Sequence, residues 1–321
     1  MIYEPMLERN VAGIREEAAA MVATAGVQAL YESVARFAVL AYAPAQHAKH
    51  ALLAALAVHE LREDLGEKFP NAVIECAIYA AESRLPWSEP PILEAHARLE
   101  GQPVDLPEIR AAVRESDRLR AERWLGARLN DADLASDFFT VATDDFEDFG
   151  HKLIVSTAAW KLGSLLGEHG RFAALRVAVW EWTAYRADTA GILFDGDRQA
   201  LLERLVANLV AARGSLEAAH AIHLFDSALE AERLGASAEA VARALGAVSI
   251  QGDGVASEGE VPCETRLPIY SYARDLAAYL EAFAIAKRIE MRFGAAVAHR
   301  IRAAACQNLE HGDELNDWSF A

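Results

Sequence analysis

The chain reads HKLIVSTAAWKLGSLLGEHGRFAAL from residue 151 to residue 175. A histidine leads an apolar run that is rich in helix-forming alanine and leucine. Leu166-Gly167 follows, and a second apolar run begins at Phe172. Glycine adopts the left-handed conformation after a helix C-terminus at low cost, so a Leu-Gly pair at this point is typical of a turn between two helices. The stretch therefore predicts a helical hairpin.

The same pattern occurs three more times along the chain. A polar residue leads an apolar run, and a large apolar residue followed by glycine closes it, in the ranges His47–Gly66, His220–Gly235 and Arg274–Gly294. The lead residue is histidine in the first two of these copies. The spacing between copies is unequal, which indicates degenerate helical hairpins and not a regular solenoid.

The rest of the chain also favours helices. Val and Ile do not form the alternating runs that strands need. Prolines gather between residues 83 and 108, and glycines and prolines between residues 251 and 268. We expect an all-α fold, an irregular array of packed hairpins around a central pocket. We expect one domain over residues 1–321, with 83–108 as the place of any subdivision and 251–268 as a mobile loop.

Composition excludes several classes of protein. The chain has 321 residues, of which 53% are hydrophobic, and its formal net charge is −17. The apolar content excludes an intrinsically disordered chain. The negative charge argues against nucleic-acid binding and against an anionic membrane surface. We expect a cytoplasmic protein, because the chain shows no signal peptide, no membrane-spanning run and no Cys-x-x-Cys pair among its three cysteines.

The histidines are the main candidates for chemistry. Two pairs have the His-x-x-His spacing, which places both imidazoles on one face of a helix, within reach of one metal ion. If the hairpins pack around a common axis, their leading histidines converge, and a nearby carboxylate completes a metal site. The predicted ligands are His47, His50, His151, His220, His223 and Asp226. The predicted catalytic residues are His151 and His220, because a histidine can also act as a general base near neutral pH.

Two other interpretations of these residues stay open. The histidines either line a polar substrate pocket in their neutral form, or they share no common site. The acidic run at residues 144–149 precedes His151. It is either a solvated helix N-terminus, which the helix dipole favours, or a set of carboxylates that orient the imidazoles.

The histidine-led hairpins resemble the questin oxidase-like family. The matching stretches are His47–Leu53, Gly150–Ile154 and Ala219–His223. This resemblance implies an all-helical enzyme that carries out a Baeyer–Villiger-type oxygenation of an aromatic polyketide ketone, with NADPH as the reductant. It also implies that the lead histidines, His47, His151 and His220, line the site.

We therefore expect an oxidoreductase, a monooxygenase that acts on an aromatic small molecule in a histidine-lined pocket. The expected metal is non-haem iron, with copper, manganese or zinc as alternatives. Homo-oligomerisation stays open, and no nucleic-acid or membrane partner is expected. The alternative functions are a non-catalytic helical-repeat scaffold for protein partners and a protein that binds a small molecule without turnover.

Overall fold

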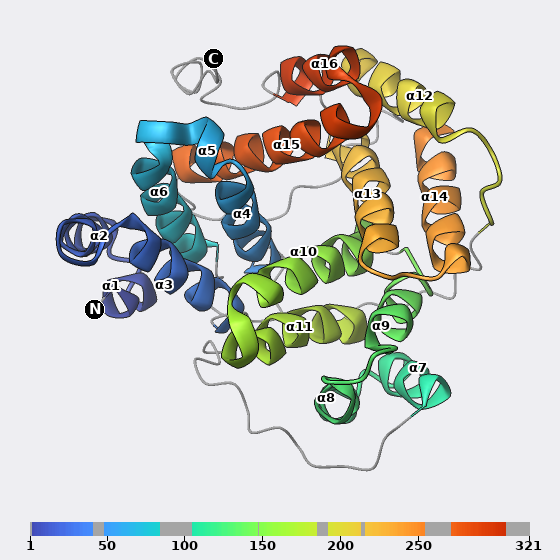
Figure 1. Ribbon diagram of the computed structural model, residues 1–321, viewed down its shortest axis with the longest axis horizontal. Coiled ribbons are helices and arrows are strands. Elements are labelled where there is room, and N and C mark those ends of the chain that lie inside the picture. Colours follow the sequence, from blue (N-terminus) through green and yellow to red (C-terminus); the bar gives the residue numbers. More distant parts are fainter. Residues whose placement is uncertain are drawn as a thin grey trace. The chain divides into compact units, whose positions relative to one another are not determined.

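The computed structural model describes residues 2–40, 48–83, 105–146, 148–184, 192–212, 216–253 and 271–305 (Figure 1). Most of these residues lie in helices, and none of them lies in a β-strand, so the all-α prediction is confirmed. The chain divides into two compact units. The central pocket, the internal repeats and the single domain stay predictions.

Unit 1 consists of Met1–Leu93, Glu258–Lys287 and Ile301–Ala321. Helix α6 contacts α2, α3 and α4, so it lies at the centre of this unit. Small and branched apolar side chains fill the space between these helices, and Val34, Ala72 and Ile78 are fully buried. The helices that belong wholly to this unit are α1 (Tyr3–Leu7), α2 (Val11–Ala25), α3 (Val27–Leu40), α4 (Ala48–Glu60), α5 (Arg62–Leu65), the short 3-10 helix η1 (Gly66–Lys68) and α6 (Phe69–Glu82).

Unit 2 consists of Glu94–Ser257 and Arg288–Arg300. Helices α15 (Ser271–Phe293) and α16 (Ala295–Ala305) each contribute residues to both units. The elements that belong wholly to unit 2 are α7 (Leu106–Arg114), α8 (Arg118–Arg128), α9 (Leu134–Ala142), the 3-10 turn η2 (Asp148–Gly150), α10 (His151–Leu165), α11 (Gly167–Ala184), α12 (Arg198–Ala211), α13 (Leu216–Arg233) and α14 (Ala238–Asp253).

The predicted glycine turns are confirmed. The φ angles are +50° at Gly66, +71° at Gly167, +106° at Gly235 and +92° at Gly294, all in the left-handed region that favours glycine. Two of these turns join α10 to α11 and α13 to α14, and each of these hairpins is tightly packed (Figure 1).

Aromatic side chains fix the position of α10 within unit 2. Trp182 of α11 packs against Phe138 of α9 with ring centroids 4.6 Å apart, and both are fully buried. The indole Nε1 of Trp182 also donates a hydrogen bond of 2.9 Å to the hydroxyl of Ser156 on α10. Aromatic pairs of this kind contribute about 0.5–1.5 kcal/mol beyond their buried area. The N-terminal half of α10 is therefore held firmly in the core.

The two irregular stretches predicted from the sequence fall mostly outside the described residues. Ser83 closes α6 and the carboxylate of Asp105 caps α7, so residues 84–104 are the part of the first stretch that is not described. In the second stretch α14 continues to Asp253, so residues 251–253 are helical and not part of a loop. The remainder, 254–268, lies outside the described residues.

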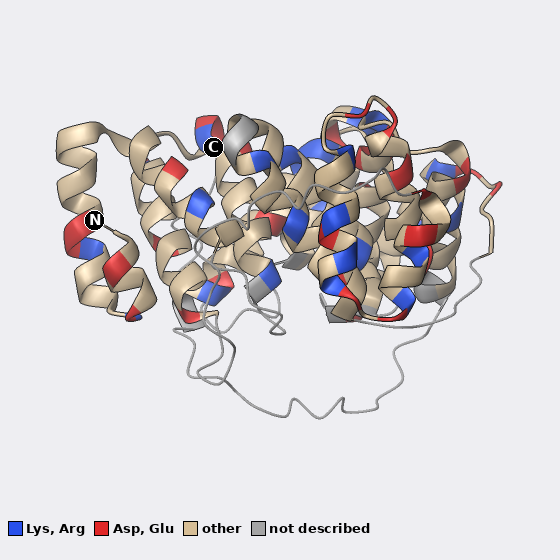
Figure 2. Ribbon diagram, turned by 90° about the horizontal axis from the view of Figure 1, so that it is seen from below, with Lys and Arg blue, Asp and Glu red and all other residues tan. Residues whose placement is uncertain are grey.

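Charged residues are spread over the described helices. In the view of Figure 2 the acidic and basic residues of the described helices are interspersed along them. No helix among the described residues has both the length and the apolar character that crossing a membrane requires.

Candidate functional site: a histidine pair in unit 2

A constrained turn delivers His151 to the start of α10. Phe149 and Gly150 both have positive φ angles, +57° and +82°. Lys152 forms an ion pair with Asp145, and both side chains are buried. A buried charge is stable only when it is paired, so this contact anchors the chain on both sides of the turn. The backbone that positions His151 is therefore fixed by packing and by charge.

His151 faces His220 of α13. Their Nε2 atoms are 3.2 Å apart, and their rings are 4.8 Å apart at an interplanar angle of 65°. Both residues are buried, with relative exposures of 4% and 9%. The Phe149 ring packs against the other imidazole, that of His220, at 5.1 Å. Packing of α10 against α13 therefore brings together two nitrogens that are 69 residues apart in sequence.

The 3.2 Å separation fits two kinds of chemistry. A neutral imidazole can donate a hydrogen bond to a second one at this distance. Two imidazole nitrogens that bind one ion at about 2.0–2.1 Å in tetrahedral geometry lie about 3.3–3.4 Å apart. The pair is therefore arranged either to share a proton or to hold a metal ion.

His223 lies one helical turn beyond His220 on α13. Burial lowers the pKa of its imidazole well below the usual value, and the charges of Arg288, His220 and His151 lower it further. The ring is therefore neutral at pH 7, which is the form that binds metal ions and accepts protons. Three histidines of unit 2 are thus close enough to influence one another electrostatically.

Asp226, on the same helix, is held by an arginine. Its Oδ2 accepts hydrogen bonds from Nε and Nη2 of Arg288, at 2.8 and 2.6 Å. Burial raises the pKa of Asp226, and the guanidinium group opposes this effect. Its Oδ1 is buried without a hydrogen-bond partner. One oxygen of the carboxylate is therefore bound by Arg288, and the other is buried without a hydrogen bond.

The structure brings only some of the predicted residues together. His151, His220, His223 and Asp226 belong to unit 2, whereas His50 belongs to α4 of unit 1. There the Nδ1 atom of His50 is 3.9 Å from an Oε atom of Glu281. Its convergence with the other histidines stays a prediction. His47 lies outside the described residues.

Two carboxylates of the acidic run before His151 form ion pairs with basic side chains. Asp144 accepts hydrogen bonds from Arg110 at 2.6 and 2.7 Å and from Arg243 at 3.2 Å. Asp145 binds Lys152, as described above. The prediction of a solvated helix N-terminus is wrong for Asp145, which is only 6% exposed. These carboxylates therefore tie the turn to α7, α10 and α14.

Sequence reasoning missed Arg288, Lys152 and Phe149. A signal for Arg288 was present, because His223, Asp226 and Glu230 interrupt an apolar helix at spacings of three and four. Such a buried polar stripe requires countercharges from a neighbouring helix. The sequence gives no comparable signal for the aromatic contact of Phe149.

In comparisons with known proteins, no family model, no curated protein and no solved structure matches the chain.

Proposed function

We propose that this chain is an oxidoreductase and that His151 and His220 hold its catalytic metal ion. The observation that carries the proposal is the 3.2 Å separation of their Nε2 atoms inside a buried site. This distance lies close to the spacing of two nitrogen ligands on one ion. The neutral imidazole of His223, one turn away, is the candidate for a further ligand.

The donor set favours a first-row transition metal. Imidazole suits iron, copper, nickel and zinc, and a site with few protein ligands keeps coordination positions open for dioxygen or substrate. Iron is our first choice, with copper, manganese and zinc as alternatives. We leave Asp226 out of the proposed ligand set, because Arg288 binds its Oδ2.

The proposed reaction is the oxygenation of an aromatic ketone, which the resemblance to the questin oxidase-like family supports. A ketone, dioxygen, NADPH and a proton give an ester, NADP⁺ and water. One oxygen atom enters the carbon–carbon bond beside the carbonyl, and the other leaves as water. NADPH supplies the two electrons. The proposal includes a cytoplasmic location, in agreement with the free, buried Cys76.

A second candidate function follows from the same distance. At 3.2 Å one neutral imidazole can donate its Nε2 proton to the other, so the pair can move a proton to or from a bound substrate without a metal. A phenol or an enol is the type of substrate whose proton such a base removes.

Metal content separates the two candidates. The untagged protein, purified without chelators, is analysed for metals by mass spectrometry. We expect about one equivalent of a single transition metal, and we expect His151→Ala and His220→Ala each to lose it. His299→Ala is the matched control, since His299 lies exposed on α16 and its loss leaves the pair intact.

Two results contradict the metal proposal. One is a metal-free protein after supplementation with iron, copper, manganese and zinc in turn. The other is full metal content in His220→Ala with native circular dichroism. In either case, loss of turnover in His151→Ala and His220→Ala with an altered pH profile supports the proton-transfer candidate instead.

A further inference from the structure

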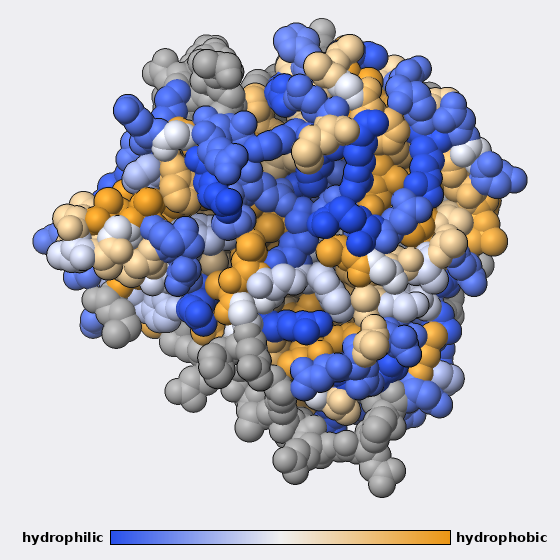
Figure 3. Space-filling model, in the orientation of Figure 1, coloured by the Kyte–Doolittle hydropathy of each residue, from blue (hydrophilic) through white to orange (hydrophobic). Residues whose placement is uncertain are grey.

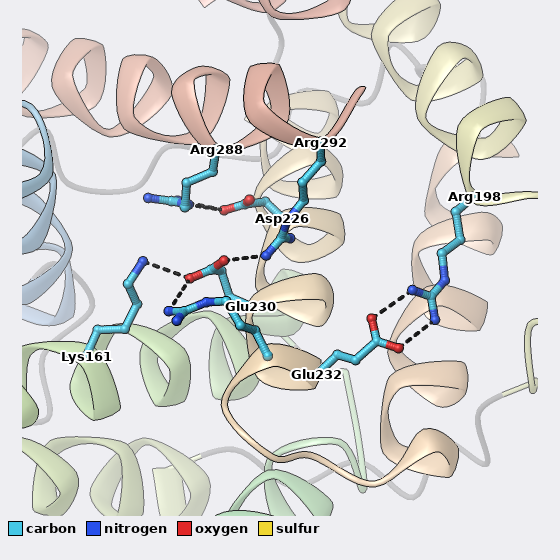
Figure 4. A network of polar contacts seen from close by, with 8 residues as sticks. Lys161, Arg198, Asp226, Glu230, Glu232, Arg288 and Arg292 are labelled. Carbon is cyan, nitrogen blue, oxygen red and sulfur yellow. Dashed lines mark hydrogen bonds and ion pairs between the residues drawn. The ribbon is translucent and has the colours of Figure 1, made fainter. Parts of the chain in front are cut away.

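A row of charged side chains follows α13 beyond the histidines. Asp226 and Glu230 lie on the same face of α13 as His223, at spacings of three and four residues. Helix α10 adds Lys161, and the last turns of α15 add Arg288 and Arg292 (Figure 4). All of these residues belong to unit 2. The histidine pair thus continues into a charged region along one helix.

Glu230 is the centre of this region. Its Oε2 accepts hydrogen bonds from Lys161 Nζ at 2.9 Å and from Arg233 Nη2 at 3.2 Å. Its Oε1 accepts one from Arg292 Nη2 at 2.6 Å. Burial opposes ionisation most strongly, but Lys161, Arg233 and Arg288 outweigh it and lower the pKa of Glu230 to about 2. Three cationic side chains therefore converge on one carboxylate.

The charges of this region do not balance. The residues labelled in Figure 4 are Lys161, Arg198, Asp226, Glu230, Glu232, Arg288 and Arg292, and Arg233 also contacts Glu230. They comprise five cations and three carboxylates, an excess of two positive charges. The chain as a whole carries −17, so this excess is opposite in sign to the rest of the molecule.

The basic side chains of this region differ in their exposure to solvent. The side chain of Arg233 is 57% exposed and that of Arg292 is 27% exposed, whereas Arg288 and Lys161 are each 14% exposed. Arg233 and Arg292 each use one nitrogen, Nη2, to bind Glu230. An arginine has five N–H donors, so further donors of both side chains stay available to a ligand. Strongly hydrophilic side chains gather over α13 on the face shown in Figure 3.

We propose that Lys161, Arg233 and Arg292 form a binding site for an anionic group, a carboxylate or a phosphate, of a small-molecule substrate. The assignment of this molecule as substrate rests on the proposed function of the histidine pair. The binding of the anion itself rests on the excess positive charge and on the available arginine donors.

The test measures binding without turnover. Inorganic phosphate and benzoate are titrated separately into the protein by isothermal titration calorimetry, so that the two anion chemistries are compared. We expect saturable binding of at least one of them, and about a tenfold loss of affinity in Arg292→Gln. Arg198→Gln is the matched control. It also removes one charge and leaves one carboxylate, Glu232, without its arginine, but it does not touch Glu230.

A conservative variant guards against unfolding. Arg292→Lys keeps the charge, so its affinity for the anion should lie within about threefold of that of the unmodified protein. Such a rescue by charge shows that the loss in Arg292→Gln does not come from a structural defect alone. The proposal is overturned if neither anion binds up to about 10 mM, well above the Kd of a weak specific site. It is also overturned if Arg292→Gln and Arg198→Gln weaken binding equally.

The outcome is independent of the proposed function. His220→Ala removes the proposed metal ligand and leaves the three cations in place, so anion binding should persist in this variant. Anion binding without any metal therefore overturns the metal proposal alone, and metal without anion binding overturns the anion site alone.

Discussion

Glu281 of α15 belongs to unit 1, and its side chain is 14% exposed. Burial raises its pKa to about 8, from an ordinary value of 4.5. The groups that interact with it are the imidazole of His50, with Nδ1 at 3.9 Å, and the side chains of Cys76 and Tyr79. Between pH 4.5 and pH 8 the folded chain holds a proton that the unfolded chain releases. The contribution of this residue to stability therefore falls as the pH rises through that range.

The variant Glu281→Gln tests this protonation state. Glutamine resembles the neutral acid in shape and cannot ionise, so we expect the variant to melt about 5 °C above the unmodified protein at pH 8. The difference should shrink strongly at pH 5, where the folded carboxyl group is neutral and the pH lies close to the pKa of the unfolded group. Differential scanning calorimetry at both pH values measures it. Glu63→Gln is the control, because the Glu63 side chain is 81% exposed. Equal differences at pH 5 and pH 8 contradict the prediction.

The sequence singles out individual candidate residues, but it does not predict their contacts. The lead position in a hairpin singles out His151 and His220, and the helical spacing adds His223 and Asp226. That the first two face each other follows from the packing of α10 on α13, and packing between distant segments leaves no local pattern in the sequence. The polar stripe of α13 indicates that Asp226 needs a countercharge, but it does not identify Arg288, which lies 62 residues away on another helix.

Among the elements, the turn η2 controls where α10 begins. Gly150 has a φ angle of +82°, and a Cβ atom at this position would lie 2.8 Å from both Cδ atoms of Leu224. Leu224 is fully buried, so its methyl groups have no free space to move into. Gly167 has a similar φ angle of +71°, but no atom lies within 4 Å of the corresponding Cβ position. Both glycines therefore have a positive φ angle, but only at Gly150 would an added Cβ atom meet a neighbouring side chain.

The variants Gly150→Ala and Gly167→Ala form a matched pair. Both impose the cost of a left-handed alanine, about 1–2 kcal/mol. Gly150→Ala adds an overlap with Leu224, which raises its total destabilisation to about 2–4 kcal/mol. Urea denaturation measures both values. We also expect Gly150→Ala to reduce the metal content, since His151 follows directly. Equal free energies of unfolding in the two variants would show that the contact with Leu224 costs nothing.

The element boundaries were predictable where their causes are local. A glycine after leucine or phenylalanine marks Gly66, Gly167, Gly235 and Gly294 as turns, and each has the expected positive φ angle. The backbone conformation at such a position depends on the residue itself. The burial of Asp145 was not predictable in this way, because it depends on Lys152, whose charge must be paired once α10 enters the core.

At the scale of the whole molecule, the net charge of −17 opposes compaction. Acidic side chains repel one another over distances of about 30 Å at 0.01 M ionic strength and of about 10 Å at 0.1 M. The buried ion pairs, such as Asp226–Arg288, with side-chain exposures of 1% and 14%, are screened much less by salt than exposed charges are. Adding salt therefore weakens the general repulsion more than it weakens these pairs.

We expect the melting temperature at pH 7 to rise by about 3 °C when NaCl is increased from about 10 mM to about 100 mM, because screening removes repulsion between exposed carboxylates. Near pH 5.0, the isoelectric point calculated from the sequence, the net charge vanishes and the same addition of salt should leave the melting temperature almost unchanged. Calorimetry at low protein concentration measures both series and avoids association near that pH. A melting temperature that falls with salt at pH 7 would mean that exposed ion pairs, and not net repulsion, dominate the long-range electrostatics. The positive charges around Glu230 would then stand out less, because exposed acidic side chains elsewhere would already be paired with cations.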